Sequence, residues 1–275
     1  KLFHLSKIWK IFFWYLELPT FILVINFFRK KRRKMADDNQ FLKYSRYAIG
    51  EIVLVVIGIL IALQINSWNE DRLARIEEKR ILSNLHQEFE TNKSILDSCI
   101  ATNKSVLSNM RQIMEVIVSH QSTFIEDQKT NNLDKLLFHS FEHENYFPSE
   151  HSLTELIQSG KMQYLKNNDL KTLLYQWSST MNRSQEDFNN VGEKVENDIL
   201  PYLTKKYPLK DMDSYGPLSW KEESRLSSDK TAILKDLEFE NLIDDNMYRM
   251  NEFLVSLSEL NELIDAILEE SSQYD

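Results

Sequence analysis

The chain is poor in the residues that form turns and nearly lacks the residue that forms disulfides. Its 275 residues include 5 Gly, 5 Pro and a single cysteine, Cys99. Ordinary usage is about 7% Gly and about 5% Pro, so the shortage disfavours β-sandwiches, Rossmann sheets and glycine-rich phosphate loops. A lone cysteine excludes an internal disulfide framework and any zinc site built from several cysteines. The motifs G-x-S-x-G, G-x-x-x-x-G-K and C-x-x-C do not occur.

Helical periodicity is what the chain has instead. The composition, 42% hydrophobic and 27% charged, is typical of neither a disordered protein nor a uniformly apolar one. Apolar residues recur three and four positions apart, and no alternating strand pattern stands out. We therefore predict an all-α fold, with an N-terminal transmembrane helix followed by an elongated helical bundle of long, coiled-coil-like helices.

Charge is distributed unevenly along the chain. Residues 1–66 carry 11 Lys and Arg against 4 Asp and Glu, a net charge of +7, whereas residues 67–275 carry 22 against 38, a net charge of −16. A run of six basic residues before the most apolar stretch favours a topology signal that also attracts anionic lipid, over nucleic-acid binding. The acidic remainder repels phosphate, so we expect no nucleic-acid partner. The run consists of Arg29, Lys30, Lys31, Arg32, Arg33 and Lys34.

Residues 47–65, YAIGEIVLVVIGILIALQI, form the most apolar stretch and contain one charge, Glu51. A helix of this length covers about 28 Å, close to the hydrocarbon thickness of a bilayer. We predict a transmembrane helix over residues 47–66, and a buried helix of a soluble protein is the alternative. Gly58 and Ala62 form a small-xxx-small pair that permits helix association in lipid. The predicted anchor residues are Tyr47, Gly50, Glu51, Gly58, Ala62 and Trp68, with the aromatic residues at the interfaces.

The same charges predict an orientation. Basic residues beside a membrane helix stay in the cytoplasm, so residues 25–46 form a basic cytoplasmic segment and residues 67–275 an extracytoplasmic helical domain. No small-x-small cleavage site follows the helix, which indicates an uncleaved anchor. Residues 1–24 belong either to a further apolar span or to translated upstream sequence, because the first methionine is Met35. We expect a bacterial inner-membrane protein with a periplasmic C-terminal domain.

Two segments carry a family resemblance. Residues 47–70, YAIGEIVLVVIGILIALQINSWNE, preceded by NFFRKKRRK, resemble a widespread uncharacterised bacterial family of single-pass membrane proteins. Residues 152–174, SLTELIQSGKMQYLKNNDLKTLL, are similar to the middle of that family's domain. The resemblance implies a short basic cytoplasmic end and a helical domain of unknown function, and it implies no catalytic residue, substrate or partner.

Two long apolar stripes follow the predicted anchor, and they predict antiparallel helices packed side by side. The first includes Asn92 and Asn103 and consists otherwise of Leu82, Leu85, Phe89, Leu96, Cys99, Val106, Met110, Ile113 and Ile117. The second includes Asn261 and consists otherwise of Ile243, Met247, Met250, Leu254, Leu257, Ile264 and Leu268. Cys99 is predicted to be a small core side chain, or else an intermolecular disulfide if two chains pair through this stripe.

Shorter elements are predicted between the stripes. Local patterns indicate a helix over Leu133–Glu144, then a capping box of Ser152 and Glu155 and a left-handed turn at Gly160. A further helix is predicted from Asn168-Asp169 to about Leu203, and Pro201 should kink or end it. Residues 205–228 are predicted to form a loop.

One metal-site motif lies in this region. His139, Glu142 and His143 form an H-x-x-E-H string, which on a helix is the arrangement of an inverzincin zinc site. Glu150 and His151 lie near enough in sequence to complete a ligand shell. The alternative is a solvated helix face, which we favour because a five-residue pattern arises easily in a chain rich in glutamate. No cofactor is therefore expected.

These patterns together predict a non-enzymatic envelope protein whose anchored helical domain binds a protein partner, scaffolds, or forms a homo-oligomer. A sensor-like ligand-binding bundle is the first alternative. The 46 residues before the apolar stretch are too few for a signalling domain, so such a sensor needs a lateral partner. The zinc hydrolase built on His139, Glu142 and His143 is the second alternative.

Overall fold

A computed structural model describes residues 41–119, 130–226 and 229–272 of the chain. This part contains helices and no strands, which confirms the predicted all-α class. The α-helices are α2 (Phe41–Ser119), α4 (Thr130–Ser140), α5 (His151–Gln158), α6 (Asn168–Lys194), α7 (Leu200–Lys206), α8 (Leu209–Met212) and α9 (Leu237–Ser272). Four short turns of other types are η1 (Lys161–Tyr164), η2 (Val195–Ile199), η3 (Asp213–Tyr215) and η4 (Lys230–Lys235).

The chain divides into two compact units, residues 1–73 and 74–275. The described part of the first unit is the N-terminal portion of α2. Apolar side chains lie exposed on every side of it, from Ile49 to Ile65. Among the described residues, α2 is the one helix long and apolar enough to cross a membrane, with an 18-residue window of mean hydropathy 2.6 and no residue buried.

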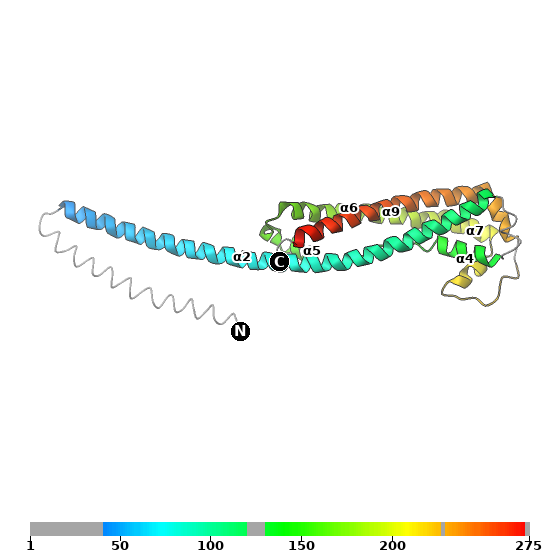
Figure 1. Ribbon diagram of the computed structural model, residues 1–275, viewed down its shortest axis with the longest axis horizontal. Coiled ribbons are helices and arrows are strands. Elements are labelled where there is room, and N and C mark those ends of the chain that lie inside the picture. Colours follow the sequence, from blue (N-terminus) through cyan, green and yellow to red (C-terminus); the bar gives the residue numbers. More distant parts are fainter. Residues whose placement is uncertain (1–40, 120–129, 227–228, 273–275) are drawn as a thin grey trace. The chain divides into compact units, whose positions relative to one another are not determined.

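The second unit is a bundle of three long helical runs: α2 from Ala74 onward, α6 with α7, and α9 (Figure 1). Helices α2 and α9 are antiparallel, because Lys93 Nζ lies 2.7 Å from Asn261 Oδ1 and His86 lies 2.8 Å from Ser271 Oγ. Helices α6 and α9 are antiparallel too and lie side by side (Figure 1). A return segment, residues 130–167, runs back along the bundle between α2 and α6.

The buried face of α2 follows the predicted stripe. All of its predicted positions from Leu82 to Ile113 are buried, including Asn92 and Asn103, and Ile117 is half-buried. The spacing alternates between three and four residues, which keeps one face of a helix toward the core. The first stripe is therefore confirmed over its length.

The buried face of α9 differs from the predicted stripe at every second position. The predicted Ile243, Met250, Leu257 and Ile264 are buried, but Met247, Leu254, Asn261 and Leu268 lie half-buried at its edge. The core positions between them are Asn246, Phe253, Leu260 and Ile267. The apolar face of α9 is wide because α9 packs on two neighbours. Phe253 packs against Phe188 of α6, with 5.6 Å between the ring centroids. Phe253 is therefore a core residue of α9 in place of the predicted Leu254.

A π-helical turn, η2, joins α6 to α7. Each π turn adds one residue to the helical spacing, and here it brings Ile199 into the core while Asp198 stays exposed. Pro201 lies in the first turn of α7, where its missing N–H is tolerated. The predicted disruption near Pro201 therefore occurs just before the proline, and the helical run continues to Lys206.

The return segment is held by two asparagine side chains of α2. Asn103 donates from Nδ2 to the carbonyl oxygen of Glu144 at 2.8 Å and accepts the Glu144 N–H at Oδ1 at 3.1 Å. Asn92 makes the same two-way pair with Ser149, at 2.7 and 2.8 Å. Each amide side chain thus satisfies both backbone groups of one non-helical residue, as a neighbouring strand would. This explains why two polar residues occupy core positions of α2.

The predicted capping box does not form at the start of α5. Its N-cap is Glu150, which makes no side-chain cap. The orphan N–H groups donate instead to the carboxylate of Glu88 on α2, from Ser152 at 2.9 Å and Leu153 at 3.3 Å. The predicted left-handed turn is confirmed, because Gly160 has a φ of 68°. Helix α6 is capped by Asn167, one residue before the predicted Asn168.

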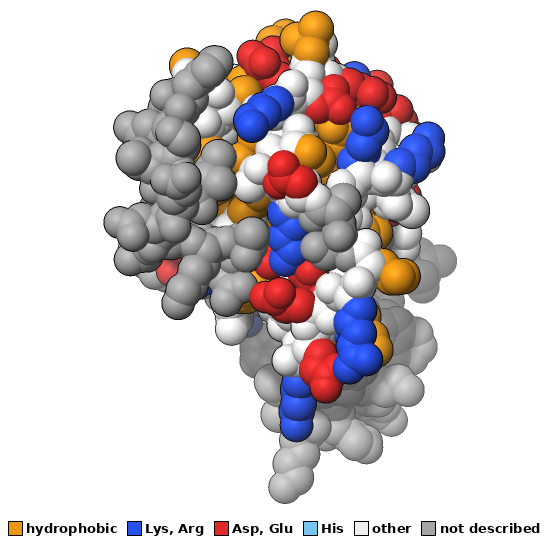
Figure 2. Space-filling view, turned by 90° about the vertical axis from the view of Figure 1, so that its right-hand side faces the viewer, with side chains coloured by type: hydrophobic (Ala, Val, Ile, Leu, Met, Phe, Trp, Pro, Cys, Tyr) orange, Lys and Arg blue, Asp and Glu red, His pale blue; other side chains and the backbone are white. Residues whose placement is uncertain are grey.

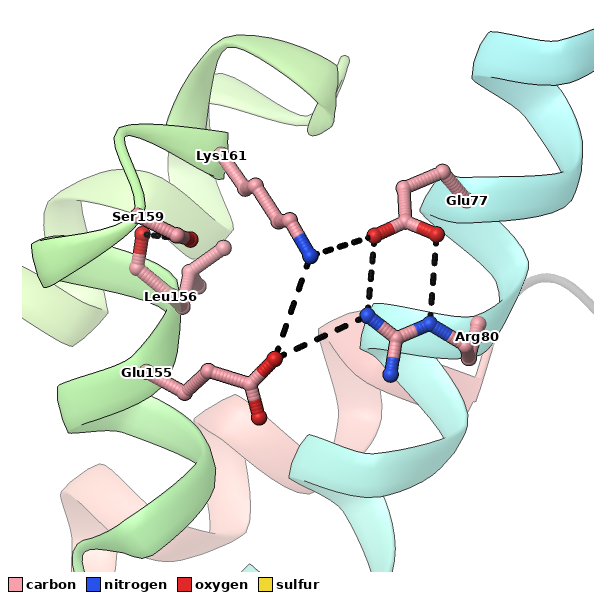
Figure 3. Close-up of polar contacts among 6 residues, drawn as sticks. All are labelled: Glu77, Arg80, Glu155, Leu156, Ser159 and Lys161. Atoms are coloured by element: carbon pink, nitrogen blue, oxygen red, sulfur yellow. Dashed lines mark hydrogen bonds and ion pairs between the residues drawn. The ribbon is translucent and has the colours of Figure 1, made fainter.

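A charged network fastens α5 and η1 to α2 on the surface (Figure 3). Arg80 Nη2 lies 2.8 Å from Glu77 Oε1 and 3.8 Å from Glu155 Oε1. Lys161 Nζ lies 2.9 Å from Glu77 Oε1 and 3.8 Å from Glu155 Oε1, so each of the two cations contacts both carboxylates. Hydrogen bonds, first from Arg80 and then from Lys161, hold the pKa of Glu77 at about 2, well below its usual value.

Candidate functional site

The H-x-x-E-H residues do not share a helix face. Helix α4 ends at Ser140, four residues before the predicted end, so only His139 is helical. His139 Nδ1 lies 2.9 Å from Glu142 Oε2, whereas His143 Nδ1 lies 3.0 Å from the carbonyl oxygen of Phe141. The helix ends here because Glu144 pairs its backbone with Asn103, which an α-helical backbone would not permit. The inverzincin geometry therefore does not form.

The two residues that were predicted to complete a zinc shell, Glu150 and His151, do not join such a cluster. Glu150 Oε1 accepts a hydrogen bond from Trp177 Nε1 at 2.8 Å, and His151 is an exposed residue at the start of α5. The His143 ring packs on Phe188 at 5.2 Å. In the described ranges, no three His, Cys, Asp or Glu side chains lie close enough together to hold a metal ion.

A buried ion cluster lies near α4 and α8. Lys230 Nζ lies 2.8 Å from Asp134 Oδ2 and 2.9 Å from Asp211 Oδ2, and each of the three residues is at most 5% exposed. Tyr207 donates to Asp134 at 2.6 Å and the Ser224 N–H to Asp211 at 2.6 Å. Burial lowers the pKa of Lys230, but hydrogen bonds to the two carboxylates outweigh it and raise the pKa overall.

Each charged group of this cluster is paired with a group from another element. The cluster therefore has a structural role and holds α4, α8 and η4 together. Burial and the hydrogen bond to Asp134 also raise the pKa of Tyr207 far above its usual value, so this hydroxyl remains a donor. The same end of the bundle carries α4 and α7, and acidic and basic side chains lie interspersed on its surface (Figure 2).

A serine and a histidine meet near the C-terminus of α9. Ser271 Oγ lies 2.8 Å from His86 Nδ1, and His86 Nε2 lies 3.6 Å from Glu90 Oε1. A hydrolase needs N–H donors beside such a serine to stabilise an oxyanion. The last turn of a helix presents carbonyl oxygens instead, and Ser271 Oγ donates to one of them, that of Leu268, at 3.2 Å. This arrangement suits a helix cap and not nucleophilic catalysis.

Cys99 occupies the core as predicted. It is 1% exposed, and burial raises the pKa of its thiol to about 12. Its Sγ lies 3.4 Å from the carbonyl oxygen of Glu144 in the return segment. The return segment covers it, so the alternative of a disulfide to a second chain does not fit this fold.

The predicted anchor residues lie along the exposed N-terminal part of α2. Tyr47 and Trp68 are 48% and 65% exposed, and a Cβ added at Gly50 or Gly58 would meet nothing within 4 Å. Glu51 is half-buried and Ala62 exposed. The predicted topology signal, residues 29–34, and the doubtful residues 1–24 lie outside the described part of the chain.

A groove of 630 Å³ between α2 and α9, here called the α2–α9 groove, is the strongest candidate for a binding site. Its α2 edge carries Asp97, Lys104 and Arg111 at seven-residue intervals, so the three charges lie on one line along the helix. Apolar side chains form its floor, and polar side chains form its α9 edge. The floor consists of Ile100, Leu107, Leu254 and Val255, and the α9 edge of Asn251, Ser258 and Asn261.

The sequence interpretation missed this groove, because the apolar repeat places its charged residues on the outer face of the helix. Counted from the first apolar stripe, Lys104 and Arg111 take the b position of the heptad, whereas the e and g positions are the ones that select helical partners. The stripe alone did not show which flank the return segment covers. Only the packed structure places that segment against α6 and leaves the flank toward α9 open.

Comparisons with known proteins assign a family and no activity. No curated protein and no solved structure matches the chain significantly. A family described as a "family of unknown function (DUF6090)" matches residues 51–197, which is more than half of the chain and extends from the apolar part of α2 through α6. The matched range includes the α2 edge of the groove and the return segment. The chain therefore belongs to the DUF6090 family of unknown function.

Proposed function

We propose that this protein is a membrane-anchored, non-enzymatic helical protein of the bacterial envelope that binds a protein partner outside the cytoplasm. The observation that carries the proposal is the apolar window of α2, which is 18 residues long with no residue buried. Exposed Val, Ile and Leu side chains on all sides of a helix are costly in water and favourable in lipid.

The orientation rests on the charges beside this helix. The basic run at residues 29–34 precedes it and the acidic residues 67–275 follow it, so the basic end stays in the cytoplasm and the bundle lies outside. In a bacterium with two membranes this is the inner membrane, with the bundle in the periplasm. The anchor residues Tyr47, Gly50, Glu51, Gly58, Ala62 and Trp68 then contact lipid or a second helix.

A binding role is supported by the way the bundle is built. The return segment is tied down by Asn92, Asn103 and Glu88, which leaves the α2–α9 groove as a fixed concave surface on rigid helices. Helix grooves of this kind typically accept a partner helix.

Fractionation tests the anchor. The full chain, expressed in its native host, is expected to pellet with membranes after alkaline carbonate washing and to dissolve only in detergent. Recovery of the intact chain in the soluble fraction would contradict the proposal.

Cysteine labelling tests the orientation. In a Cys99→Ala background, cysteines introduced separately as Ser178→Cys and Asp38→Cys are treated with a membrane-impermeant maleimide in cells whose outer membrane has been permeabilised. We expect labelling of position 178, which is exposed on α6, and protection of position 38 until the inner membrane is lysed. The reverse pattern would overturn the orientation.

A further inference from the structure

The charges along the α2–α9 groove form an ordered pattern. Asp97, Lys104 and Arg111 are each seven residues apart, and Ile100 and Leu107 lie between them at alternating three- and four-residue steps. Two turns of a helix take about seven residues, so all five side chains lie on one strip of α2 facing the groove. Charged and apolar side chains therefore alternate along the strip, and the charges are negative, positive and positive in chain order.

The two cations of this strip are available for a partner. Many other cations of the bundle are engaged in ion pairs, such as Lys93 with Asp265 at 2.9 Å and Lys194 with Asp245 at 2.7 Å. Across the described ranges, neither Lys104 nor Arg111 has an acidic oxygen within 4.0 Å, and both are exposed. Other exposed cations in the described ranges, such as Lys205 and Lys221, also lack an acidic partner, so what distinguishes Lys104 and Arg111 is their position seven residues apart on one edge of the groove.

The floor of the groove suits an apolar helix face. Leu254 and Val255 of α9 lie opposite Ile100 and Leu107 of α2, and Val255 is 52% exposed. A helix laid between two others contacts them with residues at i, i+3, i+4 and i+7. The volume, 630 Å³, corresponds to several side chains and not to a whole buried helix, so the occupant lies in the groove with its outer face in water.

A second copy of this chain fits the groove poorly. Two concave grooves do not interlock, so a second copy would have to insert a different face of its surface. Such a head-to-tail contact either closes into a ring or continues as a filament. A different protein has no such constraint.

We propose that the α2–α9 groove binds an amphipathic helix of a different protein, with acidic residues opposite Lys104 and Arg111 and a basic residue opposite Asp97, at seven-residue intervals. The apolar residues of that helix cover Val255 and Ile100. The charges set its register and direction, because a reversed or shifted helix places like charges together. This inference rests on the partner-binding role proposed above and names the chemistry of the partner.

Site-specific photocrosslinking in the native host tests the proposal. p-Benzoylphenylalanine is incorporated at Val255 of the full chain, and at Tyr175 as a control, which is 63% exposed on α6. We expect an adduct from position 255 whose crosslinked peptide belongs to another protein and carries the predicted charge order on one helix face. No adduct above the position 175 level, an adduct with a second copy, or a peptide without this charge order overturns the proposal.

Charge reversal measures how much Lys104 and Arg111 contribute to this crosslinking. Lys104→Glu with Arg111→Glu should lower the adduct yield about tenfold, because two attractive contacts become repulsive. Lys205→Glu with Lys221→Glu changes the net charge equally on exposed residues outside the groove and should change the yield less than twofold. Reversing the two acids of the identified helix should restore crosslinking to the doubly reversed chain, and failure to restore it contradicts the register.

The result is separable from that of the proposed function. The same cells are fractionated, and a chain that pellets with membranes but yields no groove adduct rejects this inference alone. A chain found in the soluble fraction rejects the membrane anchor, whatever the crosslinking result.

Discussion

The carboxylate of Glu88 on α2 lies at the N-terminus of α5, where it accepts the N–H of Ser152 at 2.9 and 3.1 Å. It also accepts the hydroxyl of Ser149 at 2.7 Å. One side chain thus serves as the N-cap of a helix 64 residues away in sequence. A negative charge at this end also interacts favourably with the helix dipole, so Glu88 couples the return segment to the core helix.

Replacing Glu88 should destabilise the bundle more than replacing an exposed polar residue does. Glu88→Ala leaves three donors near α5 without their acceptor, and we expect the free energy of unfolding to fall by about 1–3 kcal/mol. Urea unfolding of the purified chain in detergent, followed by circular dichroism, measures this. Glu90→Ala, two residues along α2 and exposed, is the matched control and should change the free energy by less than about 0.5 kcal/mol. Equal effects of the two substitutions would refute the capping role.

The buried cluster makes a second prediction. Lys230→Met removes the cation between Asp134 and Asp211 and leaves two buried carboxylates facing each other. We expect a loss of about 3–5 kcal/mol in unfolding free energy, because an uncompensated buried charge is costly. Lys235→Met, in the same turn η4, removes the same charge without breaking this cluster and should be near neutral. Retention of wild-type stability by Lys230→Met would show that the cluster contributes nothing.

The third prediction concerns Glu77 and the loss of stability in acid. Its pKa is held at about 2 in the folded protein, below the ordinary value of 4.5. A lowered folded-state pKa contributes stability that is present above the unfolded value and lost as the pH falls through the folded one. Between pH 5 and about pH 2 the wild type should therefore lose more thermal stability than Glu77→Gln, which lacks this ionisation.

Thermal unfolding of both proteins across that pH range measures the difference, with Glu115→Gln as an exposed control. Parallel curves for the wild type and Glu77→Gln would contradict the assigned role of the Arg80 and Lys161 contacts.

Membrane insertion provides the last prediction. Val56→Arg places a charge near the middle of the apolar part of α2 and should cost about 2.5–3.5 kcal/mol of insertion free energy. The fraction of chain that resists carbonate extraction should fall, as measured by immunoblotting of pellet and supernatant. Ile157→Arg, at an exposed site on α5, is the control and should leave the fraction unchanged. An unaffected Val56→Arg protein would argue that this stretch does not contact lipid.

Part of the architecture follows from periodicity alone. The stripe from Leu82 to Ile117 predicted the core face of α2 correctly, because a long apolar repeat leaves only one face that can be buried. The second stripe was only half correct, because α9 has apolar residues at both Phe253 and Leu254. Which of them faces the core depends on Phe188 of another helix.

The local motifs between the stripes were less reliable. The H-x-x-E-H string reads as a helix face from spacing alone, yet the backbone of Glu144 pairs with Asn103, 41 residues earlier, and α4 ends first. The Ser152 capping box lost its role to Glu88 for the same reason. In both places a polar side chain on α2 offered a better partner than the local one.

The sequence by itself determined the helical class, the long membrane-length apolar segment and the core face of α2, since these depend on spacing between near neighbours. Tertiary structure decided which groove of the bundle is filled by the return segment and which remains open beside Lys104 and Arg111. It also decided that Asp134, Asp211 and Lys230 meet in the core. These choices depend on contacts between residues far apart in the chain, and no local pattern encodes them.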